Sequence, residues 1–498
     1  MMMPFLRKRQ VAQTGADGLR KESEAPDLRV GTLVYTRRGL LLLFIWLLTG
    51  DFLFSMMEML QQRVLPVLLR AHDASDKEIA VIVSMIFGIL SAVLNPVIGY
   101  VSDRTRTRWG RRIPFLIVAT PLVTIFLAVL PYSPEIAEWL MEAPFTAKLL
   151  AWFPVRPLIL VFGVLVTLFQ IANAIILSVY YYLLRDVVPA GHLGRFMSLF
   201  RIFGIAAGFV FGFWIFGMVE AHSKGIFLGI SLLYGLGFGA MCCFVKEGGY
   251  PPVEQAERAG GGLPGAIRNY AVQCFGAPIY RWIYLTRTAL MVAWVSNTFL
   301  VFFLRDQIHL SLDTIGKIGA IGSLVVLPIA YPFGVLLDRW GSVRSMFLAM
   351  AGVLLALLGC FFFVRDWASF LLMSLLLALP IGLQSIGDIV LAQSLFHPQR
   401  MGQLCSANVL IWSLATVSAA PVCGAFFTWV HDYRYVYVWN AFFVALAIIA
   451  FIRVHHHWRK LGGPDHYSPP LPGAMCSTDL RVFSKRMEST QVNNQSNV

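Results

Sequence analysis

Long apolar runs, separated by short polar segments, repeat along almost the whole chain. Each run holds about 20 predominantly apolar residues, the length that a helix needs to cross the roughly 30 Å hydrocarbon core of a bilayer. We place spans near residues 39–61, 79–101, 114–131, 158–184, 196–218, 223–245, 282–304, 314–336, 345–364, 367–393, 403–428 and 435–454. The pattern predicts an all-α integral membrane protein with twelve transmembrane helices.

One longer polar segment divides these spans into two sets of six. It contains Pro251, Pro252 and three consecutive glycines at 260–262, which mark a loop rather than a span. The N-terminal residues lack the apolar stretch before a small-residue cleavage site that defines a secretory signal, so the first run should remain as a helix. We therefore expect an N-terminal tail at 1–37, a six-helix bundle at 38–245, a linker at 246–278, a second six-helix bundle at 279–455 and a C-terminal tail at 456–498.

Composition and charge support a membrane location. The chain is 57% hydrophobic and 13% charged, whereas a soluble chain carries roughly a quarter charged residues. Its net charge of +13 comes from basic residues in short loops and tails, where the positive-inside bias accounts for it, so we expect no nucleic-acid partner. The loop from Asp103 to Arg112 carries five arginines and should be cytoplasmic. By this parity the linker and both tails are also cytoplasmic, and we expect the plasma (cell inner) membrane.

A short pattern occurs twice. Gly99-x-x-x-Asp103-Arg104 follows the second span, and Gly334-x-x-x-Asp338-Arg339 follows the second span of the second set, 235 residues later. Equivalent positions in both sets indicate a duplicated six-helix unit. Parallel repeats of this kind are a transporter architecture in which the substrate lies near the bilayer midplane between the halves.

The segment Asp103-Arg-Thr-Arg-Thr-Arg-Trp-Gly-Arg-Arg-Ile-Pro-Phe115 is the strongest motif of the chain. A carboxylate among guanidinium groups can form bidentate pairs that lock one conformation and release in another. Gly110 permits a tight turn, and Pro114 begins the next helix. The alternative is that the five arginines only set the orientation of the chain.

This loop resembles the G-x-x-x-D-R signature of the major facilitator superfamily. Its D-R-x-x-x-R-W-G-R-R-x-P-F spacing is similar to the sucrose:proton symporter and glycoside-pentoside-hexuronide:cation symporter branch. The resemblance extends by topology over roughly residues 35–455 and implies two six-helix bundles that work by alternating access. It also implies a cytoplasmic gate motif made of Gly99, Asp103, Arg104, Arg108, Gly110, Arg111, Arg112, Gly334, Asp338 and Arg339.

Polar residues form a stripe along the first span. Asp51, Ser55, Glu58 and Gln62 are spaced i, i+4, i+7 and i+11, so they share one face of a helix that is otherwise apolar. A charge inside a span costs about 2.5–3.5 kcal/mol and needs a partner or a wet cavity. Asp51 and Glu58 are therefore candidates for carrying a coupling proton. The alternative is a structural ion pair, for example between one of them and Arg201 or Arg63.

Three further spans carry polar faces, and the resemblance implies that the first, fourth, seventh and tenth spans line a central cavity. A sugar site needs hydrogen-bonding amides and an aromatic face. The candidates for contact with the substrate are Gln62, Gln170, Asn173, Tyr180, Trp294, Asn297 and Gln384. Each amide could instead be a helix-packing group. Arg287 and Asp388 lie near the cytoplasmic ends of their spans and are a candidate gate pair.

These features favour a secondary transporter for a small solute, a sugar or glycoside, coupled to protons. Sodium coupling is disfavoured, because residues 79–101 hold no acidic side chain where melibiose-type carriers have an aspartate pair. A carrier for another solute, an uncoupled facilitator, a transporter-like sensor and a membrane-embedded enzyme are the alternatives. The chain shows no catalytic constellation, and we expect no cofactor, no metal site and a monomer in the lipid bilayer.

Overall fold

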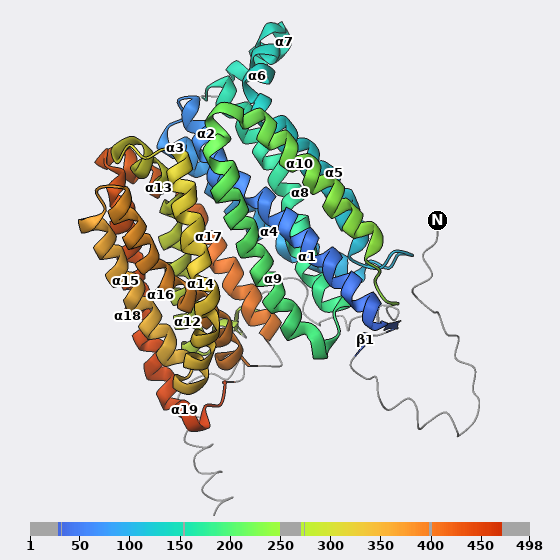
Figure 1. The fold of residues 1–498 in the computed structure, drawn as a ribbon, viewed down its shortest axis with the longest axis vertical. Coiled ribbons are helices and arrows are strands. Elements are labelled where there is room, and N and C mark those ends of the chain that lie inside the picture. The colour runs from blue at the N-terminus through green and yellow to red at the C-terminus, as the bar shows by residue number, and fades with distance from the viewer. Residues whose placement is uncertain are drawn as a thin grey trace, which may run out of the picture.

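The computed structural model describes residues 28–30, 32–152, 155–249, 270–272, 274–397 and 401–470. Within these ranges, eleven helical segments are long and apolar enough to cross a membrane. One of them, Arg195–Phe244, has 50 residues and would be about 75 Å long as a single helix, over twice the hydrocarbon thickness. Figure 1 shows that the chain reverses inside this segment, so it contributes two crossings. The predicted all-α membrane architecture is confirmed.

The first half of the chain forms one group of helices, shown from blue to green in Figure 1. Before it, β1 (Arg29–Val30) pairs with β2 (Leu33–Val34) in an antiparallel hairpin. The helices are α1 (Arg37–Met59), η2 (Leu60–Val64), α2 (Leu65–Ala71), α3 (Asp76–Ala80), η3 (Val81–Met85), α4 (Ile86–Arg104), α5 (Ile113–Val129), η4 (Leu130–Tyr132), α6 (Ser133–Glu142), α7 (Pro144–Ala151), α8 (Pro157–Val187), α9 (Ala190–Val210), η5 (Phe211–Ile215), η6 (Phe216–Met218) and α10 (Val219–Phe244).

The second half forms the group shown from yellow to red. Its helices are α12 (Pro278–Val295), η7 (Ser296–Phe299), α13 (Leu300–Phe302), η8 (Phe303–Gln307), α14 (Leu312–Trp340), α15 (Ser342–Phe363), α16 (Trp367–Leu395), α17 (Met401–Val430), η10 (Tyr433–Tyr435), α18 (Val436–Lys460) and α19 (Gly463–His466). The last membrane helix runs to Lys460, past the predicted start of the C-terminal tail at residue 456. Residues 1–27, 250–269 and 471–498, which cover most of both predicted tails and of the linker, lie outside the described residues.

Four segments of the described chain have π-helical geometry, with one extra residue in the turn: η2, η3, η5 and η8. Such turns are rare and occur mostly as single insertions within α-helices. Here each lies in a membrane-spanning helix, toward the same end of the molecule.

Side-chain caps fix several helix starts. The Thr36 hydroxyl accepts the Gly39 N–H, and Ser75 forms a reciprocal capping box with Glu78. Asp366 caps α16 in the same manner through Ser369. The hydrogen bond from the Ser369 hydroxyl holds the pKa of the Asp366 carboxyl below its ordinary value, so this cap stays charged at neutral pH.

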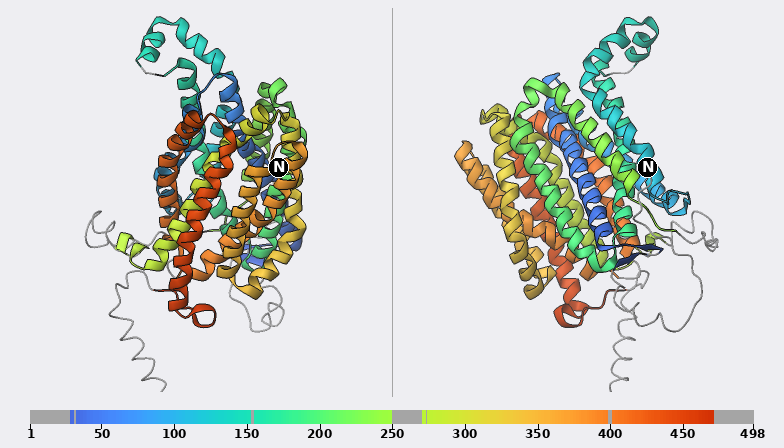
Figure 2. Two further views of the ribbon diagram at one scale, coloured as in Figure 1. Left: turned by 90° about the vertical axis from the view of Figure 1, so that its left-hand side faces the viewer. Right: turned by 45° about the vertical axis from the view of Figure 1, so that its right-hand side comes forward.

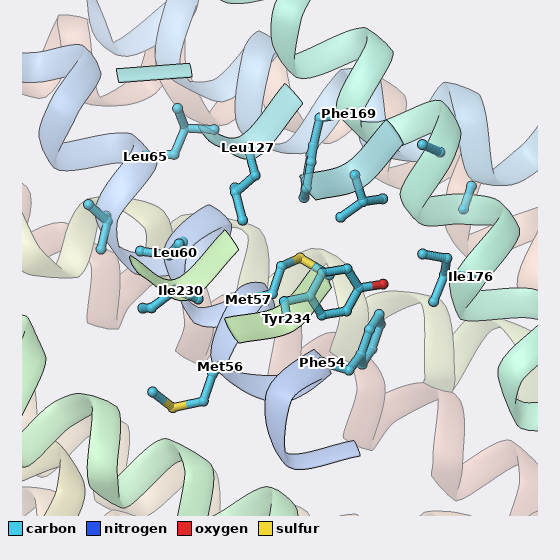
Figure 3. Close-up of a cluster of buried hydrophobic side chains, with 14 of the residues drawn as sticks. Phe54, Met56, Met57, Leu60, Leu65, Leu127, Phe169, Ile176, Ile230 and Tyr234 are labelled. Carbon is cyan, nitrogen blue, oxygen red and sulfur yellow. The ribbon is translucent and has the colours of Figure 1, made fainter. Parts of the chain in front are cut away.

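The larger apolar core is centred on the first half and extends into α12, α17 and α18, and another core lies within the second half. Figure 3 shows part of the larger core, where side chains from α1, α5, α8 and α10 meet, among them Phe54, Leu127, Phe169 and Tyr234. The second half packs α12 against α17 and α18, and α15 against α16. Removing a large apolar side chain from water stabilises a soluble protein by about 1.5–3 kcal/mol. Between helices in lipid this hydrophobic term is absent, and close van der Waals packing stabilises the contact instead.

The halves meet along two seams. In one, α17 packs against α3, η3 and α4; in the other, α14 packs against α9, η5 and η6. We name the two ends of the bundle by residues that lie there: the Arg111 end, with the loop between α4 and α5, and the Tyr433 end, with η10. Helices α6 and α7 project from the bundle at the Tyr433 end (Figures 1 and 2).

Candidate functional site

Asp51 lies on α1 with its side chain buried and 3% of the residue exposed. Its Oδ2 has no hydrogen-bond partner, and no ion pair among the described residues includes it. The alternative of an ion pair with Arg201 or Arg63 is therefore not observed. Leaving a buried polar oxygen without a partner costs about 1–3 kcal/mol, so Oδ2 marks a place where a proton, water or ligand would bind. Gly204 of α9 leaves room beside it, since a Cβ there would lie 3.9 Å from Asp51 Oδ2 and from Ser55 Oγ.

Glu58 has a different environment two turns further along α1. Its Oε1 accepts the Asn173 Nδ2 hydrogen at 2.7 Å, and its Oε2 accepts the Gln62 Nε2 hydrogen at 3.2 Å. Both oxygens of the Glu58 carboxyl group therefore have an amide donor, whereas Asp51 Oδ2 has none. The contact also joins the first and fourth spans, as the common face of the candidate residues requires.

Gln170 and Asn173 are both 1% exposed on α8. Neither polar atom of the Gln170 amide has a hydrogen-bond partner, and Asn173 Oδ1 also lacks one. Leaving a buried polar group unsatisfied costs about 1–3 kcal/mol, so these atoms mark a place where a ligand or water would bind. Gln62, by contrast, is exposed.

Tyr180 does not reach an open face. It is fully buried, it packs near Phe54 and Phe238, and its hydroxyl donates to the Leu47 carbonyl at 2.7 Å. This arrangement gives no support to the predicted substrate contact, because the helix turns that side chain into the core. The next residue, Tyr181, is 45% exposed. It lies within range of electrostatic interaction with Asp51, Glu58 and Arg201.

In the second half the predicted pair between Arg287 and Asp388 is formed. Arg287 Nη2 donates to Asp388 Oδ2 at 2.5 Å and joins α12 to α16. Both side chains are partly buried, 18% and 25% exposed. Gln384 lies one turn before Asp388, is buried, and has an Oε1 without a hydrogen-bond partner. The contact is observed, while its role as a gate stays a prediction.

Asn297 and Trp294 have structural contacts. Asn297 Oδ1 accepts the Asn440 Nδ2 hydrogen at 2.9 Å, and Asn440 Oδ1 in turn accepts the Ser296 hydroxyl at 2.6 Å. Trp294 is half-buried against the core of the second half. The Asn297 side chain is nevertheless exposed, so its remaining amide hydrogens can reach a solute.

The motif loop is held by carboxylates from the same half of the chain. Arg111 donates to Asp186 through Nε at 2.9 Å and Nη2 at 2.6 Å. Arg112 Nε also donates to Asp186, at 3.2 Å, and its Nη1 donates to the Ser102 hydroxyl at 2.5 Å. Asp186 at the end of α8 therefore clamps both arginines, a bidentate geometry that adds strength and direction.

Glu247, just after α10, caps the N-terminus of α5. Its carboxylate accepts the backbone N–H groups of Arg111, Arg112 and Ile113 at 2.9, 2.7 and 2.7 Å. A negative charge at this position also complements the helix dipole. Gly110 has φ +113°, and a Cβ there would lie 2.5 Å from the Glu247 carboxyl carbon, so the turn requires glycine.

The remaining gate residues are less informative. Arg108 is exposed and stacks over Trp109, and Arg339 is exposed at the end of α14. Gly334 has open space where a Cβ would point. The side chains of the four other predicted gate residues lie outside the described part of the chain: Gly99, Asp103, Arg104 and Asp338.

A polar cluster joins the halves at the Tyr433 end. The Tyr433 hydroxyl of the second half donates to Asp76 Oδ1 at 2.8 Å, and Arg70 pairs with the same oxygen at 3.1 Å. Arg70 also bonds to Tyr433 and lies 5.0 Å from the ring centre of Phe302. This cluster, together with an ion pair between Arg305 and Glu220 at 2.9 Å, ties the halves together at this end.

Asp186, Glu247 and Tyr433 are functional contacts that the sequence patterns did not predict. Asp186 follows Arg185 and Glu247 follows Lys246, so each acid directly follows a base at the end of a span. Loop parity places both acids at the same end as the arginine-rich loop, and this could have identified them as its partners. Tyr433 has no comparable signal.

Two open grooves, of about 540 and 550 Å³, lie away from these residues. The first runs between α8 and the helix formed by α3, η3 and α4; the second lies between α15 and α16. None of the candidate residues lines either groove.

Comparison with known proteins gives a family and a fold. The sequence profile of the Major Facilitator Superfamily matches residues 47–420 and 288–475. The general alpha-glucoside permease of Schizosaccharomyces pombe (strain 972 / ATCC 24843) is 25% identical over 185 residues, which cover 35% of this chain and 32% of the permease. The match thus spans about a third of that relative's length.

Several solved structures have the same fold. A bacterial homologue of the iron transporter ferroportin, in the inward-facing state, is 19% identical and superimposes with a TM-score of 0.57 over 83% of this chain and 99% of its own. The nucleoside transporter NupG is 14% identical, with a TM-score of 0.57 over 83% and 98%. An auto-inhibited peptide transporter of the POT family is 14% identical, with a TM-score of 0.58 over 86% and 99%.

Proposed function

We propose, from the premise that the chain belongs to the Major Facilitator Superfamily and is a membrane transporter of that type, that it carries a sugar or glycoside together with a proton. The proposal that transport is coupled to a proton rests on the environment of Asp51. The substrate half rests on the polar groups of α8 and α16 and on the match to the permease.

Asp51 has the properties of a reversible proton carrier. It is buried on a membrane helix with no ion pair among the described residues, and one oxygen lacks any hydrogen bond. In this conformation the unsatisfied Oδ2 is available to bind a proton. A conformation that brings water or a cation to Asp51 would favour release, and alternation between the two would couple proton flux to transport.

Sugar recognition is supported by the chemistry of the unsatisfied groups. Gln170, Asn173 and Gln384 offer amide atoms without partners, and Tyr181 adds an exposed aromatic ring. Hydroxyl-rich solutes supply both donors and acceptors to such groups. The solved structures of low identity support the fold alone, and their varied substrates leave other solutes as alternatives.

The conformation is closed at the Tyr433 end, where Arg70, Asp76 and Tyr433 meet across the halves. By the distribution of arginines in the loops, we place the Arg111 end in the cytoplasm. The structure then corresponds to a carrier whose outer side is closed. In the opposite state the Tyr433 contacts would have to break.

Uptake of radiolabelled sucrose, maltose and melibiose into proteoliposomes tests both halves of the proposal. The purified full chain is reconstituted with and without an inward proton gradient, and Asp51→Asn is compared with Glu142→Gln, which removes an exposed carboxylate on α6. We expect gradient-driven accumulation that Asp51→Asn abolishes and Glu142→Gln preserves. Downhill sugar exchange should survive in Asp51→Asn, because the amide retains the shape of the carboxyl.

The outcomes separate the alternatives. Sugar uptake that ignores the gradient would make the protein an uncoupled facilitator. Equal accumulation by wild type and Asp51→Asn would refute the assignment of the proton site. If a folded, correctly inserted protein transports none of the three sugars, the sugar assignment is wrong and the family assignment stands.

A further inference from the structure

The groove between α8 and the helix formed by α3, η3 and α4 is not part of the proposed transport site. Its walls belong to two candidate membrane spans, Asp76–Asn95 and Pro157–Leu184. Val164 is 51% exposed and Leu168 39% exposed on its α8 side. Exposed apolar side chains such as these are what the lipid-facing surface of a membrane span presents.

The mouth of the groove is charged while its body is apolar. Lys77 and Glu78 line the mouth at the Tyr433 end, and Ile82 and Ile86 line the wall below them. Arg156 lies beside the mouth, where its Nη2 is 3.4 Å from Glu78 Oε2. Glu78 is paired with Arg156, so the exposed Lys77 is the one charged side chain of the groove lining that has no ion pair among the described residues, and it lies where lipid headgroups would lie.

The length of the groove matches one leaflet. Its wall on the α8 side runs from Val155, just before α8, to Leu168 of α8, about 20 Å at a helical rise of 1.5 Å per residue. Half of a bilayer, including the headgroup region, is about 20–22 Å thick. An amphipathic molecule with an anionic head at Lys77 and a chain beside Ile82 and Ile86 would fill the groove from mouth to floor.

We propose that this groove binds one glycerophospholipid, with its anionic phosphodiester at Lys77 and one acyl chain along α8. Gly163 makes the space, because a Cβ built there would meet no atom within 4 Å. The π-helical turn η3 (Val81–Met85) forms part of the opposite wall, and the extra residue of such a turn widens the helix locally.

The bound lipid also contacts a segment that closes the Tyr433 end. Lys77 directly follows Asp76, whose carboxylate accepts the Tyr433 hydroxyl. A Cβ at Gly424 of α17 would lie 2.6 Å from the Asp76 carbonyl oxygen and 2.9 Å from Lys77 Cα. The backbone at the mouth of the groove therefore packs closely against α17 of the second half. A lipid held by Lys77 therefore stabilises the closed arrangement of α3 against α17.

Photo-crosslinking tests this site in the full chain reconstituted in liposomes. The probe is a phosphatidylglycerol with a diazirine on one acyl chain, and labelled peptides are mapped by mass spectrometry. Gly163→Phe fills the groove. Gly239→Phe on α10, where a Cβ would also meet nothing within 4 Å, is the matched control away from it. Lys77→Gln removes the proposed headgroup contact.

We expect label concentrated in residues 77–86 and 155–168, lost in Gly163→Phe and unchanged in Gly239→Phe. Label spread evenly over the lipid-facing helices, or retained in Gly163→Phe, would overturn the proposal. Labelling by a phosphate-free diazirine diacylglycerol equal to that by the phospholipid, or undiminished in Lys77→Gln, would overturn the headgroup assignment. Val164→Trp, which adds bulk on an exposed side chain, replaces Gly163→Phe if that variant elutes as an aggregate.

Discussion

Closure of the Tyr433 end depends on the close approach of two glycines, one from each half. A Cβ built on Gly316 of α14 would lie 2.2 Å from the Gly212 carbonyl oxygen of η5. This is roughly 1 Å short of ordinary contact, and the obstacle is backbone rather than a mobile side chain. We predict that Gly316→Ala drives the halves apart at this end.

The expected size follows from the strain. Inserting a methyl group into a packed contact costs about 1–3 kcal/mol. The cost falls only on the state that is closed at the Tyr433 end, so the equilibrium should move toward the open state by about 5–150-fold. Gly212→Ala, with its Cβ 2.8 Å from the Gly316 carbonyl oxygen, should have a smaller effect. Gly322→Ala, on the same helix with open space, should have none.

Double electron–electron resonance measures this directly. Spin labels at Ala71 and Arg365, exposed positions at the Tyr433 end of the two halves, are placed in a variant whose seven native cysteines are replaced. A longer distance component should appear and should grow from Gly322→Ala to Gly212→Ala to Gly316→Ala. Identical distributions in all three variants would refute the reasoning, because the glycine contact would then not determine closure.

Three further changes test individual contacts. Glu247→Gln weakens a charged cap of three N–H groups and should lower the melting temperature by about 2–4 °C, measured by the fluorescence of a thiol-reactive dye on heating. Tyr180→Phe should leave the KM for the transported solute unchanged in uptake assays, since its hydroxyl only bonds to Leu47. Arg287→Met and Asp388→Leu should each destabilise the protein, and the double variant should recover part of the loss, with a coupling energy of about 0.5–3 kcal/mol in the same melting assay.

Each of these has a contrary result. A melting temperature of Glu247→Gln equal to that of Glu142→Gln would show that the cap contributes nothing measurable. A raised KM in Tyr180→Phe would return that side chain to the substrate site. Additive effects of Arg287→Met and Asp388→Leu would mean that the observed pair has no energetic coupling.

Apolar periodicity predicted the helices well, because a span must be about 20 residues long whatever its neighbours are. The pair Arg287 and Asp388 could also be anticipated, since opposite charges inside spans at the same depth have few other partners. Tyr180 shows the limit of this reasoning. A helical face is about 100° wide, and a single residue of rotation separates a buried Tyr180 from an exposed Tyr181.

The interhelical contacts of the motif loop could not be derived from spacing. Arg111 and Asp186 are 75 positions apart, and Arg111 and Glu247 are 136 apart, so only the packing of α5 between α8 and α10 brings them together. The lack of a hydrogen-bond partner for the Gln170 amide could not be predicted either, because a sequence shows which polar groups exist and not which of them remain unpaired.

The four π-helical turns make this chain tolerant to changes in length at particular places. Removing one residue from a regular α-helix rotates everything beyond the deletion by about 100° and turns a lipid-facing surface inward. Removing one residue from η2, η3, η5 or η8 can instead convert the wide turn into an ordinary one. Relatives of this protein that differ by a single residue in a span should therefore have gained or lost that residue within these four turns. Each turn is then the site of a one-residue insertion.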